Sequence, residues 1–122
     1  MRKRFILAIG VLSVCVLLTA SFASAATCKT SDRNCKVTVS LTEFTGDPTV
    51  LCLIGHPVVL VSVSVRCGGQ EAGPFETKIC GSTSTPYVFQ ALGYEHTLKP
   101  GLGADWEALL GGACDDLYYE RF

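Results

Sequence analysis

The sequence predicts a mainly β fold of the β-rich α+β type. We expect a small disulfide-stabilised antiparallel sheet or sandwich of about five or six strands with one short C-terminal helix. Three observations predict this class. Several short segments alternate apolar and polar residues, the cysteine count becomes even once an N-terminal leader is removed, and a single segment near the C-terminus has helical spacing.

Residues 1–25 have the three parts of a secretory signal peptide. Basic residues 2–4 precede the apolar residues 5–18, and Ala23-Ser24-Ala25 forms an A-x-A cleavage site. An uncleaved anchor is the alternative, but the apolar run is shorter than the roughly 20 residues that cross a bilayer. We therefore expect one secreted domain over residues 26–122, without a membrane span after cleavage. It would lie outside the cell, or in the periplasm of a Gram-negative bacterium.

Cleavage changes the charge and the cysteine count. Removing 25 of the 122 residues leaves 97, and three of the ten basic residues leave with the leader. Seven positive charges then face eleven negative ones, so the net charge moves from −1 to −4. An acidic domain lacks the electrostatic footprint of a nucleic-acid-binding protein, so we expect no nucleic-acid partner. Cys15 is also lost, and the seven cysteines become six.

The six remaining cysteines predict three structural disulfides. In an oxidising compartment thiols pair with one another, and the chain has no C-x-x-C spacing that would indicate a zinc or redox site. We expect no metal and no cofactor. Each bridge would add about 2–4 kcal/mol to a domain with a modest core. The cysteines are Cys28, Cys35, Cys52, Cys67, Cys80 and Cys114.

The first half of the domain contains three predicted strands. Residues 26–34 look like a polar lead-in, and residues 36–44 alternate with period two, which predicts a half-exposed strand. The apolar run at 49–54 predicts a short buried strand. Residues 58–67 begin apolar and then alternate strictly, which is typical of a strand near the centre of a sheet.

The second half begins with the predicted loop "GGQEAGP" at 68–74, followed by strands at 75–80, 86–92 and 93–98. Trp106, Leu109 and Leu110 then recur at helical spacing. Asp105 is a candidate N-cap, and Gly111-Gly112 ends the short helix. The tail after this helix is tethered by Cys114.

Strand geometry restricts the disulfide pairing. If the segments 49–54, 58–67 and 75–80 form consecutive hairpins, then Cys52, Cys67 and Cys80 lie about 10–23 Å apart. A disulfide requires Cα atoms within about 7 Å. Each of these three cysteines would then pair with Cys28, Cys35 or Cys114, and Cys28 would not be bonded to Cys35.

The two histidines, His56 and His96, suggest a catalytic function. Small secreted nucleases work with two histidines, or with a histidine, a glutamate and an arginine, which Glu95 and Arg66 or Arg121 would supply. The spacing does not select this arrangement. His56 lies in the turn-like "GHP", and His96 and Glu95 point to opposite faces of a strand. We therefore assign no catalytic residue.

The composition favours a non-enzymatic protein that binds an extracellular protein target, in the manner of an effector, toxin or inhibitor. A disulfide-held surface loses little entropy on binding. The candidate contacts come from the segment after Cys67 and from the aromatic tail: Gln70, Glu71, Phe75, Tyr118, Tyr119 and Phe122. Two further functions fit the same composition. One is a small secreted hydrolase that uses the two histidines, and the second is a structural coat or matrix component, which would self-associate.

Overall fold

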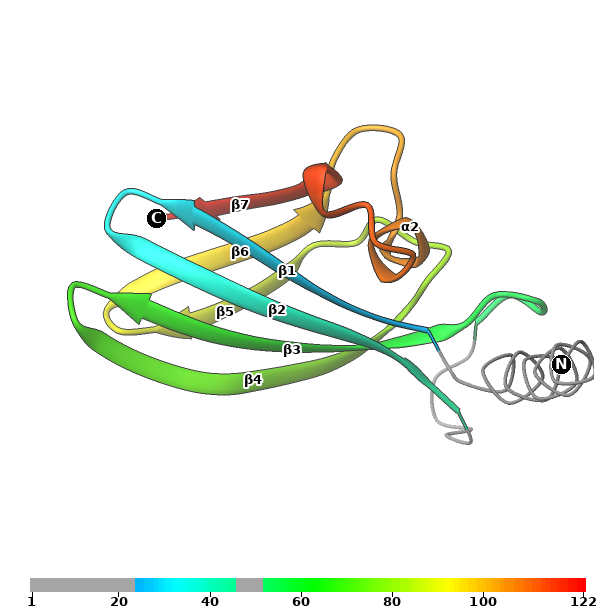
Figure 1. The fold of residues 1–122 in the computed structure, drawn as a ribbon, viewed down its shortest axis with the longest axis horizontal. Helices are drawn as coiled ribbons and strands as arrows, with labels where there is room; N and C mark the ends of the chain where they lie inside the picture. The colour runs from blue at the N-terminus through cyan, green and yellow to red at the C-terminus, as the bar shows by residue number, and fades with distance from the viewer. Residues whose placement is uncertain (1–23, 46–51) are drawn as a thin grey trace, which may run out of the picture.

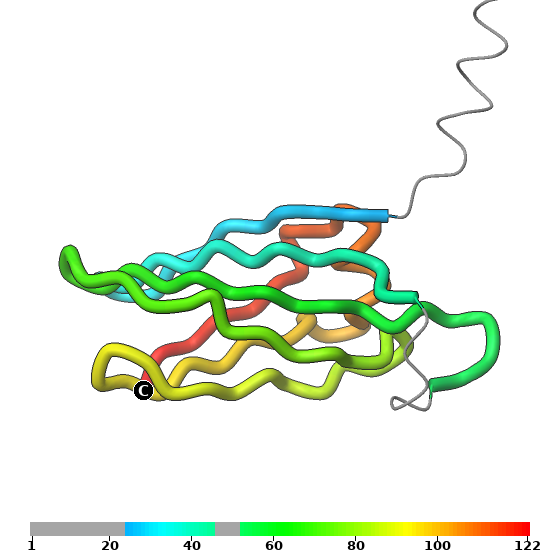
Figure 2. The backbone as a smooth tube through the Cα atoms, turned by 90° about the horizontal axis from the view of Figure 1, so that it is seen from below, coloured from blue at the N-terminus to red at the C-terminus, as the bar shows by residue number. Residues whose placement is uncertain are grey.

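The computed structural model describes residues 24–45 and 52–122, which form two antiparallel sheets packed face to face (Figure 1). Sheet A contains β1 (Ala25–Asp32), β2 (Cys35–Phe44), β3 (Val58–Cys67) and β4 (Gln70–Cys80), in that spatial order. Sheet B contains β5 (Tyr87–Ala91), β6 (Tyr94–Pro100) and β7 (Leu117–Arg121). The helix α2 (Trp106–Leu110) and the 3-10 turn η1 (Cys114–Asp116) lie between β6 and β7 in the chain. The two layers are seen edge-on in Figure 2.

The predicted fold class is confirmed, with seven strands in the described part of the chain. Two of them occupy segments that the sequence left without structure. The expected lead-in forms β1, which pairs with β2 from Ala25↔Thr42 to Asp32↔Cys35. The tail after Cys114 forms β7, which pairs with β6. The sequence does not predict β1, because β1 is an edge strand in which only Cys28 is fully buried. Its residues therefore show little alternation of apolar and polar side chains.

The predicted strand at 49–54 is wrong for its last three residues. Residues 52–54 belong to the loop that leads into β3, and residues 49–51 lie outside the described part. The predicted loop at 68–74 is also mostly strand. Gly68 and Gly69, with φ of 57° and 93°, form a two-residue turn, and β4 starts at Gln70. Such paired positive φ angles are the geometry of a tight hairpin turn.

The core lies between the two sheets and follows from the alternation of the strands. Inward residues of β2 and β3, such as Val39, Leu41 and Val61, are fully buried. Sheet B contributes Phe89 and Leu98 to the same cluster. The alternation that predicted the strands therefore also identified most of this core.

The helix α2 forms where the sequence predicts it. Asp105 is the N-cap, and its Oδ1 accepts a hydrogen bond of 2.8 Å from the Ala108 backbone N–H. Trp106 is fully buried, and its indole N–H donates to the Thr85 carbonyl at 2.9 Å. The helix covers the end of the sandwich opposite the β1–β2 and β3–β4 turns (Figure 1). No helix in residues 24–45 and 52–122 is long and apolar enough to cross a membrane.

Three disulfides form, as the cysteine count predicts: Cys28–Cys114, Cys35–Cys67 and Cys52–Cys80. Cys28 is not bonded to Cys35, which confirms that part of the pairing argument. The exclusion of Cys52–Cys80 is wrong, because Cys52 lies in a loop and is not held opposite the middle of β3. That loop leads to Val58, which pairs with Cys80 at the end of β4. The three bridges are compatible with an extracellular protein.

The Cys28–Cys114 bridge closes the longest loop, with a sequence separation of 86 against 28 for Cys52–Cys80. Replacing Cys28 and Cys114 with alanine should lower the free energy of unfolding by about 4–5 kcal/mol, because loop-closure entropy grows with loop length. The matched Cys52→Ala/Cys80→Ala variant should lose about 3–4 kcal/mol. Guanidinium unfolding of the oxidised proteins measures both values. A larger loss for the Cys52 variant, or a peptide map with other pairs, would contradict this assignment.

Candidate functional site

The outer face of sheet A is polar because its strands alternate. In β2 the side chains of Val37, Val39 and Leu41 are buried, and the intervening residues, Lys36 and Thr38 among them, are exposed. The same alternation exposes Lys29 on β1 and Arg66 on β3. These three cations gather on the outer face, toward the end that carries the β1–β2 and β3–β4 turns. We call Lys29, Lys36 and Arg66 the cationic face.

The strand register brings two of these cations directly together. Lys36 pairs with Arg66 across β2 and β3, and Lys29 pairs with Thr38 in the next row. Directly opposed side chains have Cβ atoms about 4.5–5.5 Å apart, and like charges in such pairs destabilise the sheet. The cationic face therefore carries an electrostatic cost in the free protein.

Little in the described part of the chain compensates these charges. Arg66 pairs with Glu71 at 3.5 Å, but both side chains are well exposed, and an exposed pair contributes little. Within residues 24–45 and 52–122, Lys29 and Lys36 form no ion pair. The positive charge of the face is therefore available to a ligand.

The cationic face borders an open hollow of about 820 Å³ on the outer surface of sheet A. A second hollow of about 230 Å³ lies between the two hairpin turns and shares Lys36 and Arg66 with the first. The polar side chains around the larger hollow include Lys29, Ser31, Lys36, Thr38, Ser64, Arg66 and Glu71. The surface thus combines cations with hydroxyl groups.

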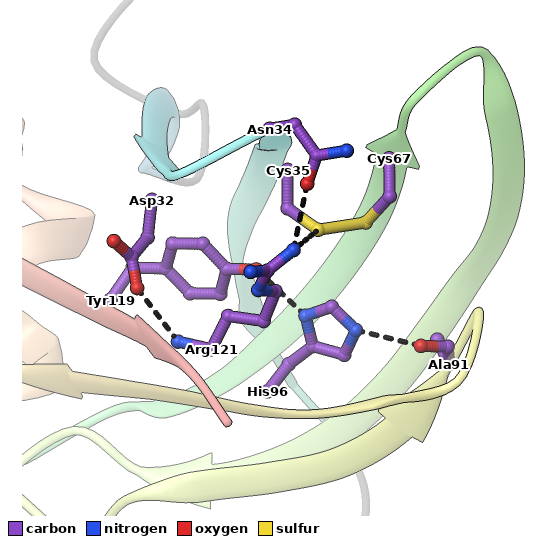
Figure 3. The surroundings of a disulfide bond; sticks show 8 residues. All are labelled: Asp32, Asn34, Cys35, Cys67, Ala91, His96, Tyr119 and Arg121. Carbon is purple, nitrogen blue, oxygen red and sulfur yellow. Dashed lines mark hydrogen bonds between the residues drawn. A yellow bond between two sulfur atoms is a disulfide. The ribbon is translucent and has the colours of Figure 1, made fainter.

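Covalent and polar links hold this end of sheet A in place (Figure 3). The Cys35–Cys67 disulfide joins the residues next to Lys36 and Arg66. The Gly68 backbone N–H donates to the Asn34 carbonyl at 3.3 Å, which connects the two turns. These links fix the spacing of the strands that carry the cations.

Arg121 of β7 ties the same end to sheet B (Figure 3). Its guanidinium donates from Nη1 to Asn34 Oδ1 at 2.7 Å, and its backbone N–H donates to Asp32 Oδ2 at 3.0 Å. The guanidinium carbon also lies 4.0 Å from the centre of the Tyr94 ring. These contacts connect the β1–β2 turn to β7.

Cations outnumber acidic residues at the end of sheet A that carries the two hairpin turns, where Asp32 and Glu71 also lie. The cationic face, with the exposed Arg33 in the adjacent turn, lies toward one end. Acidic residues gather around α2 and η1 at the other end (Figure 1). They are Asp105, Glu107, Asp115 and Asp116. The outer face of sheet A is therefore positively charged near these turns, although the expected mature domain has a negative net charge.

The two histidines are not brought together. His96 is fully buried, its Nε2–H donates to the Ala91 carbonyl at 2.9 Å, and its Nδ1 accepts from the Tyr119 hydroxyl at 2.7 Å (Figure 3). His56 precedes β3 at the far end and pairs through Nδ1 with Glu107 at 2.9 Å. Since the ten residues of β3 span roughly 30 Å, the two rings cannot act on one substrate.

The predicted contact residues after Cys67 occupy different environments. Gln70 and Glu71 are exposed at the start of β4, and Glu71 borders the larger hollow. Phe75 faces the interior, where its ring lies 4.9 Å from that of Phe89. Two of the three residues therefore lie at the surface, close to the cationic face.

The aromatic tail is divided by the alternation of β7. Tyr119 points inward to His96, whereas Tyr118 and Phe122 are exposed. On the outer face of sheet B, the Tyr118 hydroxyl donates to Glu120 and Lys99 lies over the Tyr118 ring. Of the three aromatic rings of the tail, that of Tyr119 therefore belongs to the core, and those of Tyr118 and Phe122 lie at the surface.

The alternation places Lys36 and Arg66 on the polar sides of their strands, but no local pattern predicts the cationic face. Its formation depends on the register between β2 and β3 and on the pairing of β1 with β2. Neither is encoded in a local pattern. Among the described residues, no group of three or more histidine, cysteine or acidic side chains is arranged to hold a metal ion.

The chain matches no protein-family model, no curated protein and no solved structure. Its function is therefore inferred from the geometry and charge of the surface.

Replacing Tyr119 with phenylalanine should lower the free energy of unfolding by about 1–2 kcal/mol, because His96 Nδ1 would be buried without a donor. Burial, with Asp32 as a second cause, raises the pKa of Tyr119 above its usual 10.0. The native state then keeps the phenol proton after the unfolded chain has lost it. Stability is therefore complete below about pH 10 and falls as the pH rises further.

Denaturant unfolding at about pH 8 and about pH 10.5 measures this dependence. The fall in stability between the two pH values should be smaller in Tyr119→Phe than in the wild type. Tyr118→Phe, which changes an exposed ring, should keep nearly wild-type stability at neutral pH. Equal losses in the two variants at neutral pH would contradict the role given to the Tyr119–His96 bond.

Replacing Lys36 with threonine should stabilise the free protein by about 0.2–1 kcal/mol, because it removes the like-charge pair with Arg66. The matched Lys29→Thr variant faces Thr38 instead of a cation, so its gain should be smaller. Thermal unfolding at low and high salt measures both, and the Lys36→Thr gain should shrink as salt screens the repulsion. A loss of stability confined to Lys36→Thr would contradict the repulsion.

Proposed function

We propose that the protein is exported and acts outside the cell as a non-enzymatic binding protein whose contact surface for a negatively charged target is the cationic face. The leader-like residues 1–25 and the three disulfides support export. Effectors, toxins and inhibitors all act by such binding.

The observation that carries this proposal is the direct opposition of Lys36 and Arg66, which the exposed Arg66–Glu71 ion pair offsets only weakly. The two cations lie opposite each other on neighbouring strands, next to a disulfide that keeps these strands from separating. Such a pair costs stability in the free protein, and an anionic partner removes that cost when it binds. A surface that keeps this cost is better explained by a ligand than by folding.

The rigidity of the surface supports the same function. The two hairpin turns are linked by the Asn34–Gly68 backbone bond, and Arg121 fastens them to sheet B. A target that meets a preordered surface does not have to order it, so less of the interaction free energy is lost on binding.

The positions of the histidines argue against a hydrolase that uses both of them. A hydrolase of the two-histidine kind requires both rings at one substrate. His96 is buried with both ring nitrogens bonded, and His56 lies at the opposite end of the sandwich.

Charge reversal at the cationic face tests the proposal. The labelled, oxidised domain is added to a cell-wall or extracellular-matrix preparation, and the bound fraction is measured across a concentration series. Lys36→Glu should weaken binding at least about tenfold. Lys99→Glu makes the same charge change on the outer face of sheet B and should leave binding near the wild-type level.

Raising the salt concentration should weaken wild-type binding more than binding by Lys36→Glu, since the variant has lost part of the screened attraction. Equal binding by Lys36→Glu and Lys99→Glu, or wild-type binding that does not respond to salt, would rule out the cationic face as the contact surface.

A further inference from the structure

We propose that the ligand of the cationic face is an acidic saccharide, that is, a chain of hydroxylated sugars bearing carboxylate or sulfate groups. This inference rests on the proposed function and adds the chemical class of the target. It follows from the hydroxyl groups of the face, from the spacing of its cations, and from what the surface lacks for other polyanions.

Hydroxyl side chains lie beside the cations in two neighbouring rows of sheet A. The register gives the outer row as Ser31, Lys36, Arg66 and Glu71, and the next row as Lys29, Thr38 and Ser64. A serine or threonine hydroxyl both donates and accepts hydrogen bonds. Sugar hydroxyls require both kinds of partner, whereas a carboxylate, sulfate or phosphate group only accepts.

The three cations together are spread too widely for one small anion to contact all of them. Lys29 and Arg66 lie on strands separated by β2, which places them about 10 Å apart across the sheet and two residues apart along it. Lys36 lies between them. This distribution suits an extended chain that carries anionic groups at intervals, with neutral hydroxyls between them.

Other polyanions fit the surface less well. No aromatic side chain lines the hollow, so single-stranded nucleic acid would lack the stacking that holds its bases. An acidic peptide could add a strand only at the edge strands β1 and β4, because β2 and β3 are already paired on both sides within sheet A. Such a strand would lie beside the cationic face and not across it. A saccharide needs neither feature.

A panel of defined probes tests the inference on the oxidised mature domain by titration calorimetry. The probes are a heparin-derived hexasaccharide, an oligogalacturonate, a neutral dextran oligomer, an oligoglutamate peptide, single-stranded DNA and phosphatidylserine vesicles. We expect at least one of the two acidic saccharides to bind most tightly and the neutral dextran not to bind. Lys36→Glu should weaken the binding of that saccharide at least about tenfold, and Lys99→Glu should not.

The hydroxyl variants separate saccharide recognition from general attraction of anions. Thr38→Val keeps the shape and strand propensity of the side chain but removes the hydroxyl beside the cations. It should weaken saccharide binding about three- to tenfold and leave oligoglutamate binding unchanged. Thr42→Val makes the same change on the same strand and face, away from the hollow, and should leave both unchanged.

The inference is overturned if peptide, DNA or vesicles bind as tightly as the saccharides, if neither acidic saccharide binds, or if Thr38→Val and Thr42→Val behave alike. Matrix binding that depends on Lys36 but is not competed by either saccharide would overturn the ligand class and keep the proposed function. Matrix binding that ignores Lys36 would overturn the proposed function itself. Near-wild-type fluorescence of the buried Trp106 shows that each variant is folded.

Discussion

The Cys35–Cys67 disulfide joins directly opposed residues of β2 and β3, with 4.1 Å between their Cα atoms, at the end of sheet A that carries both hairpin turns. The bridge fixes the register of the two central strands, and the register decides which side chains face one another. This register places Lys36 opposite Arg66 and, in the next row, Thr38 opposite Ser64. Arg121 then attaches the same end to sheet B through Asn34 and Asp32. The arrangement of the surface thus depends on this cross-strand link, while the Cys28–Cys114 bridge joins β1 to the segment that leads into β7.

The charged surface of the domain lowers its stability. A small domain has little hydrophobic core to spare, and opposed cations reduce the net stability that remains. The disulfides offset this cost, because they raise stability without requiring a larger hydrophobic core. With its three disulfides, the domain can accommodate opposed cations that would leave an uncrosslinked domain of the same size less stable. The Cys35–Cys67 bridge therefore holds the strands of the cationic face as well as the fold.

The local patterns predicted part of the fold closely. Strict alternation located β2 and β3, and the spacing of Trp106, Leu109 and Leu110 with the cap Asp105 located α2. Local patterns failed where pairing decides structure. The segment 26–34 has few apolar residues and becomes a strand because β2 offers it an edge. The apolar run around Cys52 looks like a strand, but residues 52–54 form a loop that brings Cys52 to Cys80. Apolar composition alone does not separate a strand from a loop fastened by a bridge.

By itself, the sequence determined the β-rich class, the number of disulfides, the inward faces of the central strands and the position of the helix, because each depends on residues close together in the chain. Only the tertiary structure decided the disulfide pairs, the burial of His96, its separation from His56, and the gathering of Lys29, Lys36 and Arg66. These features depend on strand register and on the stacking of two sheets, which join residues distant in sequence. A shift of one residue in either strand would have turned the same cations to other neighbours.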